Sequence, residues 1–192
     1  MSHFEANLRV LRQMRPRLAA MMEAAEPLEP ERLIPTRSGG WTAQVETPSG
    51  QRILLASKYR PEEEARRFLE GYEFGPTTTF VILGMGMGYH VSEAHRRKKA
   101  ECRLVVVEAD PRTFRTALAN EDLAALLADE KVHIHVGERI GDLFQELRAY
   151  LFDLFGPPAR KSDGTPCRPI QIVPHRPSMD VSPDFYREFQ VH

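Results

Sequence analysis

Residues 80–110 read FVILGMGMGYHVSEAHRRKKAECRLVVVEAD. They begin with an apolar run, continue through closely spaced glycines and a polar amphipathic segment, and end with a second apolar run followed by acids. Short apolar runs rich in β-branched and aromatic residues are typical of strands buried on both faces of a parallel sheet. The stretch therefore predicts a β-α-β unit with strands at 79–83 and 103–107.

The glycines Gly84, Gly86 and Gly88 lie between the first strand and the following helix. Glycine adopts positive φ and carries no Cβ, so the backbone can turn sharply and leave the amides at the start of the helix open to a ligand. Glu108 ends the second strand, at the sheet edge where an acid can accept hydrogen bonds from ribose hydroxyls. These four residues are candidates for binding a small molecule.

The glycine spacing is G-x-G-x-G, because Tyr89 stands where the dinucleotide fingerprint G-x-G-x-x-G has its third glycine. With the acid at the end of the second strand, the pattern resembles the first two motifs of class I S-adenosylmethionine methyltransferases and the related polyamine synthases. Many α/β domains use a similar turn only for tight packing, and this interpretation remains open.

Residues 132–138 read VHIHVGE and predict a third parallel strand that is followed by an acid. In methyltransferase-like sheets an acid at this point lies near the adenine, which makes Glu138 a further candidate for ligand binding. Glu138 also suits the N-terminus of a helix over 140–155, and both interpretations stay open. His133 and His135 share one strand face, but no third ligand is evident nearby, so we expect no metal site.

Composition limits the classes of protein that fit. The chain has 192 residues, of which 42% are apolar and 28% charged, enough for one good core or a main domain with a small appendage. A net charge of -1 gives no sign of nucleic-acid binding. Cys102 and Cys167 form no Cys-x-x-Cys pair, which fits a reducing compartment without a zinc site. With neither a signal peptide nor a membrane-length apolar run, we expect a cytoplasmic protein that does not enter a membrane.

The remaining patterns divide the chain into two predicted domains. Residues 1–75 predict a small α+β lead-in, and residues 76–192 predict a Rossmann-like α/β domain with a mainly parallel sheet flanked by helices. The lead-in is expected to contain, in order, a helix over 4–24 interrupted at Pro16, a proline-containing linker over 26–35, a β-meander with strands at 41–47 and 52–57, and a helix over 61–71. The second domain is expected to add helices over 111–118, 120–128 and 182–189, a loop over 156–169, and a fourth strand at 170–173.

Four blocks of sequence resemble the N-terminal region of the motility-associated factor (Maf) glycosyltransferases. They occur in the same order and read FEANL (4–8), ASKYRP (56–61), LGMGMGYH (83–90) and VEAD (107–110). A later segment, His175-x-Pro177 with Pro183-x-x-Tyr186-x-x-Phe189, is similar to the end of that region. The third block is the most specific, so the resemblance adds Tyr89 and His90 to the candidate site.

The resemblance implies an N-terminal Rossmann-like module without its catalytic domain. Proteins of the Maf family attach nonulosonic sugars to flagellin, and their transfer chemistry is assigned to a central domain that nothing here matches. We therefore expect an accessory module of a flagellin glycosyltransferase, with no assigned catalytic residue and with flagellin and a C-terminal catalytic domain as possible partners. The resemblance leaves its ligand undefined, with S-adenosylmethionine and nucleotides as candidates.

Two other hypotheses remain. A working methyltransferase needs an acceptor pocket and catalytic groups beyond the fourth strand, and its fold has seven strands where this chain predicts four. A non-catalytic scaffold that docks flagellin or the catalytic domain needs only the fold.

Overall fold

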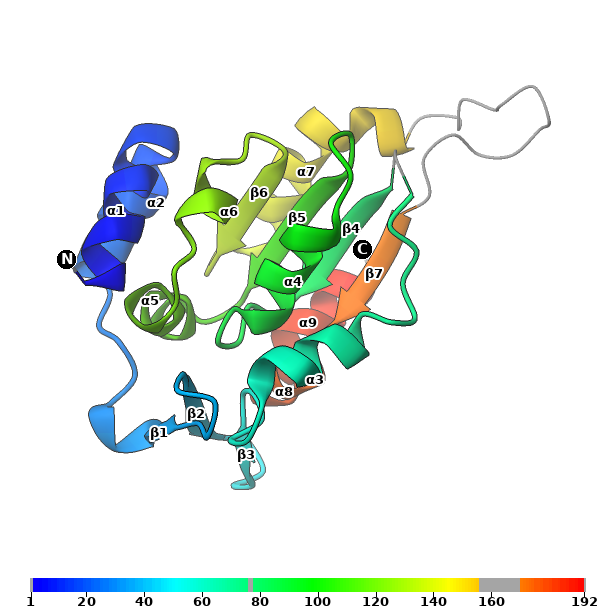
Figure 1. Ribbon diagram of the computed structural model, residues 1–192. Coiled ribbons are helices and arrows are strands. Elements are labelled where there is room, and N and C mark those ends of the chain that lie inside the picture. The colour runs from blue at the N-terminus through cyan, green and yellow to red at the C-terminus, as the bar shows by residue number, and fades with distance from the viewer. Residues whose placement is uncertain (1, 76–77, 156–169, 192) are drawn as a thin grey trace.

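The computed structural model describes residues 2–75, 78–155 and 170–191 (Figure 1). The predicted loop over 156–169 lies outside the described residues. Two sheets are present, a central parallel sheet and a smaller antiparallel one. Among the described helices, none has the length and apolar character needed to cross a membrane.

The central sheet has four strands in the order β6-β5-β4-β7. Its strands are β4 (Thr79–Leu83), β5 (Arg103–Glu108), β6 (Val132–Val136) and β7 (Ile170–Pro174). Every neighbouring pair is parallel. The predicted α/β class, with a mainly parallel sheet flanked by helices, is therefore confirmed.

The side chains of β4 explain why this strand lies at the centre. All five residues of β4 are buried. Phe80 and Ile82 belong to the core on one face of the sheet, whereas Val81 and Leu83 belong to the core on the other. Full burial of one such side chain stabilises the fold by roughly 1.5–3 kcal/mol. A continuous apolar run is the pattern that a strand covered on both faces requires.

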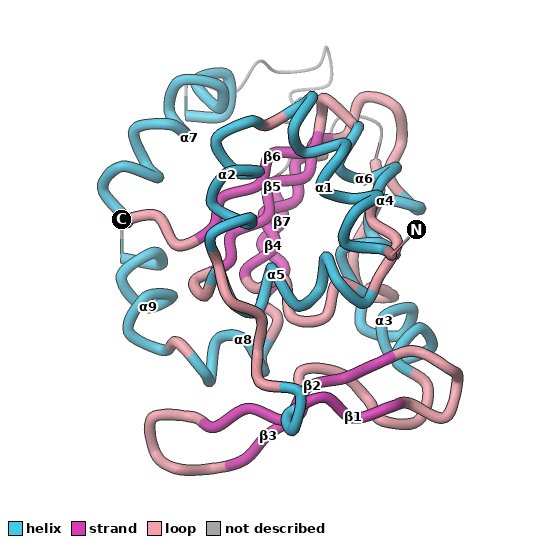
Figure 2. Tube along the Cα trace, turned by 90° about the vertical axis from the view of Figure 1, so that its left-hand side faces the viewer, coloured by secondary structure: helices cyan, strands magenta, loops and turns pink. Residues whose placement is uncertain are grey.

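Helices cover both faces of the sheet, as the edge-on view in Figure 2 shows. One face is covered by α4 (Tyr89–Arg97), α5 (Pro111–Asn120) and α6 (Ala124–Ala128). The other is covered by α7 (Ile140–Phe155), α8 (Arg176–Val181) and α9 (Pro183–Val191). The sequence did not predict α8, although Pro177 is compatible with the first turn of a helix.

The chain begins with α1 (His3–Met14) and α2 (Pro16–Ala24), which are separated at Arg15 as Pro16 predicts. In Figure 1 both helices lie beyond α5 and α6. Leu8, Leu11 and Met22 are buried in the same core cluster as one face of the sheet. The N-terminal helices therefore pack directly on the Rossmann-like part, and the predicted domain boundary at residue 75 stays a prediction.

Two polar side chains fix this packing. The Asn7 amide group donates to the carbonyls of Leu118 and Glu121, at 2.9 and 2.7 Å, and its oxygen accepts from the Leu123 amide at 3.0 Å. The Arg15 guanidinium donates to three main-chain carbonyls around the edge strand β6, those of Leu127, Asp129 and Val132.

The antiparallel sheet consists of β1 (Leu33–Pro35), β2 (Trp41–Glu46) and β3 (Arg52–Leu54), preceded by the short helix η1 (Pro30–Arg32). The meander prediction is confirmed for β2 and β3. The prediction of a linker over 26–35 is wrong at its end, because residues 33–35 pair with β2. Pro35 is tolerated because β1 is an edge strand. Helix α3 (Pro61–Phe68) is shorter than predicted.

Replacement of Arg15 tests how the N-terminal helices are held. We expect Arg15→Met to lower the free energy of unfolding by about 1–3 kcal/mol, because it removes the donors to three carbonyls while keeping the apolar stem. Arg12→Met is the control, because Arg12 is exposed and pairs with the exposed Glu23. Urea unfolding of both variants measures the difference. Equal stabilities would contradict the proposed role of Arg15.

Candidate functional site

The candidate site lies where the strand order of the sheet reverses. Strands β5 and β6 lie on one side of β4, and β7 lies on the other. In open α/β sheets, ligands bind outside the carboxyl ends of the strands at such a reversal. The glycine turn follows β4, and His175 follows β7, so both flank this point.

All three glycines of the turn have positive φ: 100° at Gly84, 50° at Gly86 and 94° at Gly88. Gly88 is the N-cap of α4. The predicted sharp turn between strand and helix is therefore present, with the backbone conformation that glycine permits.

The space beside the turn is filled by the chain itself. A Cβ on Gly84 would lie 2.6 Å from the hydroxyl oxygen of Ser178 and closer still to its β carbon. A Cβ on Gly86 would lie 2.7 Å from the Cε1 atom of His175. The β7–α8 junction thus occupies the position from which a ligand would approach these two glycines.

Glu108 lies beneath the turn and is only 3% exposed. One carboxylate oxygen accepts from the Met85 amide at 2.7 Å, and the other accepts from the Asp110 amide at 3.0 Å. Burial raises the pKa of Glu108 to about 7, and the amide hydrogen bonds oppose that rise. The acid therefore binds the Met85 amide of the glycine turn itself, and its predicted contact with ribose hydroxyls stays a prediction.

Two imidazoles stack above the turn. His90 and His175 have ring centroids 4.1 Å apart and planes inclined by 11°. The Nε2–H group of His90 donates to the Gly84 carbonyl at 2.8 Å, and Nδ1 of His175 lies 2.8 Å from the hydroxyl oxygen of Ser178. The ring of Phe68 in α3 is perpendicular to the His90 ring, with centroids 5.8 Å apart.

Both rings are neutral near pH 7. Burial lowers the pKa of His90 to about 4. Burial, followed by the nearby His90, lowers the pKa of His175 well below its ordinary value. Two cationic rings at this separation would repel each other, whereas neutral rings can stack.

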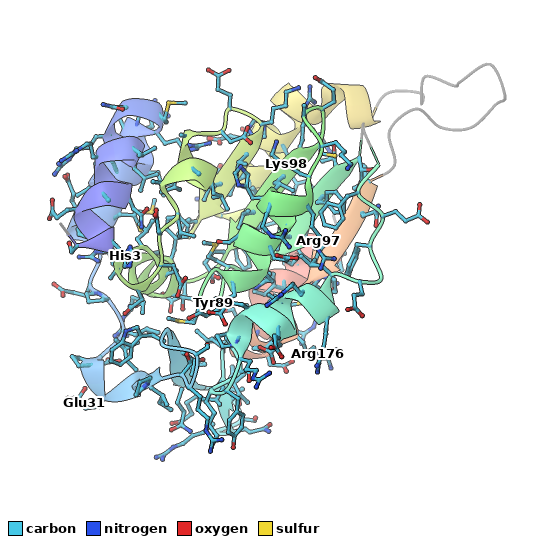
Figure 3. All side chains as sticks on the ribbon, in the orientation of Figure 1. His3, Glu31, Tyr89, Arg97, Lys98 and Arg176 are labelled. Carbon is cyan, nitrogen blue, oxygen red and sulfur yellow. The ribbon has the colours of Figure 1, made fainter. Side chains whose placement is uncertain are left out.

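Tyr89 joins the antiparallel sheet to α4. Its hydroxyl accepts from the Trp41 amide at 3.0 Å and donates to the Trp41 carbonyl at 2.8 Å. Figure 3 shows Tyr89 at the start of α4, facing the β1–β3 sheet. Burial and the neighbouring Glu121 raise the pKa of the phenol far above its ordinary value. In this structure Tyr89 positions one part of the chain against another.

A cavity of about 160 Å³ adjoins the stacked histidines. Its lining is mainly apolar and includes Leu55, Phe68, Met87, His90 and His175. Part of the lining comes from the lead-in, so residues before 75 close the crevice at the sheet edge. The cavity is smaller than the roughly 300–1,000 Å³ of typical small-molecule pockets.

Glu138 lies apart from the other candidates. It follows β6, which β5 separates from β4, and it lines a different groove together with Arg15 and α2. Its carboxylate lies 3.0 Å from Nδ1 of His135. The turn thus brings together Gly84, Gly86, Gly88, Tyr89, His90 and Glu108, and Glu138 belongs to another cluster.

Three residues that complete this arrangement had no predicted role: His175, Ser178 and Tyr186. The Tyr186 hydroxyl donates to the Val107 carbonyl and accepts from the Ala109 amide, both at 3.3 Å. His175 and Tyr186 belong to the later segment that resembles the Maf proteins, which was the available signal. Their contacts with the turn depend on tertiary packing, which sequence periodicity does not report.

These features define an α/β protein with a Rossmann-like parallel sheet, a glycine turn closed by its own chain, and a small antiparallel sheet beside the crevice. No family model matches the sequence. The chain is 34% identical over 98 residues to an uncharacterized protein of Treponema pallidum (strain Nichols), a match that covers 50% of this chain and 33% of that protein.

The fold is similar to that of a solved structure of a Maf glycosyltransferase from Magnetospirillum magneticum AMB-1, with a TM-score of 0.52 and 15% identity. The match covers 98% of this chain and 35% of that one. The predicted resemblance to Maf proteins is therefore confirmed for the fold. The chain spans about a third of each of these two proteins. The methyltransferase resemblance stays a prediction.

Alanine at Gly84 tests the close packing of the turn. Gly39 has nearly the same φ, 98° against 100°, but nothing lies within 4 Å of a Cβ built there. Positive φ costs an L-residue about 1–2 kcal/mol at either position. Crowding against Ser178 adds about 1–3 kcal/mol at Gly84 only. We therefore expect Gly84→Ala to destabilise the protein more than Gly39→Ala in urea unfolding.

The double variant Gly84→Ala/Ser178→Gly provides the control. Removing the Ser178 side chain makes room for the new methyl group. The Ser178→Gly substitution should therefore destabilise the Gly84→Ala variant less than it destabilises the wild type. Additive effects of the two substitutions would contradict the close packing.

The pH dependence of stability tests the buried acid. The pKa of Glu108 is raised to about 7 from 4.5, so its contribution to stability is fully present below pH 4.5 and is lost as the pH rises through 7. His90 changes stability in the opposite direction. Its pKa is lowered to about 4 from 6.5, so its contribution to stability is lost as the pH falls from 6.5 through 4. Glu108→Gln removes the Glu108 contribution and leaves the opposing effect of His90 in place. We expect unfolding free energy to rise between pH 4.5 and 7 by up to about 3 kcal/mol more than in the wild type. Parallel pH profiles would contradict the burial of a titrating Glu108.

Proposed function

We propose that this chain is an accessory, non-catalytic module of a Maf-type flagellin glycosyltransferase. Its glycine turn acts in packing, and the module helps to hold or present the partners of the reaction. The observation that carries this proposal is the close approach of Ser178 and His175 to Gly84 and Gly86, which fills the place where a Rossmann-like turn binds its ligand.

The similarity to Maf proteins supports the first part of the proposal. The fold agrees with about a third of a Maf glycosyltransferase. Four sequence blocks also resemble the N-terminal region of that family and occur in the same order. Two of these blocks, 83–90 and 107–110, form the glycine turn and contain Glu108. On this proposal, flagellin and a catalytic domain are the partners, and the sugar-transfer chemistry belongs to that domain.

The state of the polar groups supports a non-catalytic role. A general base must reach the proton that it abstracts. Glu108 is buried and accepts hydrogen bonds from amides of its own chain, and the rings of His90 and His175 stack on each other. None of these three groups is directed at an open substrate pocket of ordinary size.

Nucleotide or S-adenosylmethionine binding is the second candidate, and the position of the turn favours it. The turn lies at the reversal of strand order, where α/β proteins bind such ligands. Binding there would require the β7–α8 junction to move away from Gly84 and Gly86. It would also require a ligand to compete with Glu108 for the Met85 amide of the turn.

Calorimetric titration distinguishes the two candidates. Wild type and Ser178→Gly are titrated with S-adenosylmethionine, S-adenosylhomocysteine, and cytidine and adenine nucleotides. We expect no binding to the wild type with a dissociation constant below about 1 mM, a free energy of about -4 kcal/mol. Binding that appears only in Ser178→Gly would show a ligand site that the chain normally closes, as the proposal holds. Sub-millimolar binding to the wild type would overturn the packing role of the turn.

A transfer assay tests the absence of catalysis. The chain is incubated with flagellin and an activated nonulosonic sugar, and separately with labelled S-adenosylmethionine and candidate acceptors. We expect no transfer above the rate without protein. Turnover at enzyme-like rates in either assay would contradict the accessory role.

A further inference from the structure

A second cluster of polar side chains lies beyond the carboxyl end of β6. His135, Glu138 and Glu146 each place one ligand atom within 4.8 Å of the other two. We propose that these three residues bind a divalent transition-metal ion of the zinc type. The sequence showed no third ligand beside His133 and His135, whereas the fold brings Glu138 and Glu146 to His135.

The distances suit the ligands of one small ion. Zinc bonds of about 2.0–2.2 Å in tetrahedral geometry place neighbouring ligand atoms roughly 3.4 Å apart. Nδ1 of His135 lies 3.0 Å from an oxygen of Glu138 and 3.7 Å from an oxygen of Glu146. Shifts of a few tenths of an ångström would bring both pairs to that separation.

The fold positions the three ligands from different segments. His135 lies in β6 and is buried, with 5% of its side chain exposed. Gly137 has a φ of 63°, and a Cβ there would lie 2.7 Å from Cγ of Pro111, so this glycine permits the turn that leads to Glu138. Glu146 comes from α7. An ion would therefore link the end of β6 to the helix that covers it.

The charges favour a cation. Two carboxylates near one imidazole repel each other, and a divalent ion between them compensates both charges. Three arginines line the adjoining groove. The guanidinium of Arg15 is bound to main-chain carbonyls, that of Arg139 lies 3.2 Å from Asp142, and Arg17 is exposed to solvent.

The ligand set also defines the class of site. The imidazole is a borderline donor and the two carboxylates are hard donors. Zinc, manganese and related ions accept this combination of ligands. Three protein ligands leave a fourth position for water or another exchangeable ligand, as in zinc sites that are not purely structural. The open groove beside the cluster gives such a ligand access from solvent.

Zinc titration tests the site in the wild type, Glu146→Gln and a matched control, Glu101→Gln. Glu146 is 59% exposed, so its loss leaves the fold intact. Glu101 is likewise exposed, at 69%, but it pairs with Lys131 at the amino ends of β5 and β6, away from the cluster beyond the carboxyl end of β6. We expect calorimetry to show one zinc ion per wild-type chain. Loss of a direct ligand in Glu146→Gln should weaken binding by more than about tenfold, and Glu101→Gln should match the wild type.

Nitrogen NMR of the histidine rings locates the ion. Zinc should shift the Nδ1 resonance of His135 in the wild type and in Glu101→Gln at concentrations that leave Glu146→Gln unchanged. The proposal is overturned if the wild type binds no stoichiometric zinc, if Glu146→Gln binds as well as the wild type, or if the shifted resonances belong to other histidines.

Discussion

The structure depends on the absence of side chains at Gly84 and Gly86. Because neither residue has a Cβ, Ser178 and His175 approach the backbone of the turn more closely than any other residue type would allow. That approach places the His175 ring on His90, which in turn bonds the Gly84 carbonyl. Glu108 holds the same turn through the amide of Met85. The turn is thus fixed by side chains from α4, from the end of β5 and from the β7–α8 segment.

The domain has a Rossmann-like fold, but its glycine turn is closed at the place where proteins of that fold usually bind a ligand. A Rossmann-like turn binds a ligand by leaving amides free at a helix N-terminus. Here an internal carboxylate accepts from the Met85 amide within the turn, and the β7–α8 junction covers Gly84 and Gly86. Fold similarity alone does not assign a ligand. The His135 cluster is independent of the turn, since it involves β6 and α7, and either site can exist without the other.

The sequence predicted those elements that local patterns specify. Apolar runs bounded by glycines or acids define buried strands, so the predicted strands at 79–83 and 132–136 agree with the structure. The strand predicted at 103–107 is one residue longer in the structure, because it includes Glu108. Helix α8 and strand β1 were missed, because Pro177 and Pro35 obscure them and because β1 is specified by pairing with β2. Gly86 contacts His175, and His135 contacts Glu146, although the residues of each pair are separated along the chain. A single sequence does not reveal such contacts. It does not reveal the burial of Glu108 either, because that burial also depends on how separate segments pack together.

Amide hydrogen exchange at Met85 reports whether the turn is closed in the free protein, because this amide donates to Glu108 at 2.7 Å in the closed turn. The exchange rate is measured by NMR in the protein alone and after addition of S-adenosylmethionine or a nucleotide. We expect slow exchange at Met85 in the free protein and no change on addition of either compound. Rapid exchange in the free protein that becomes slow when one of these compounds is added would contradict it, since the turn would then be an open ligand site.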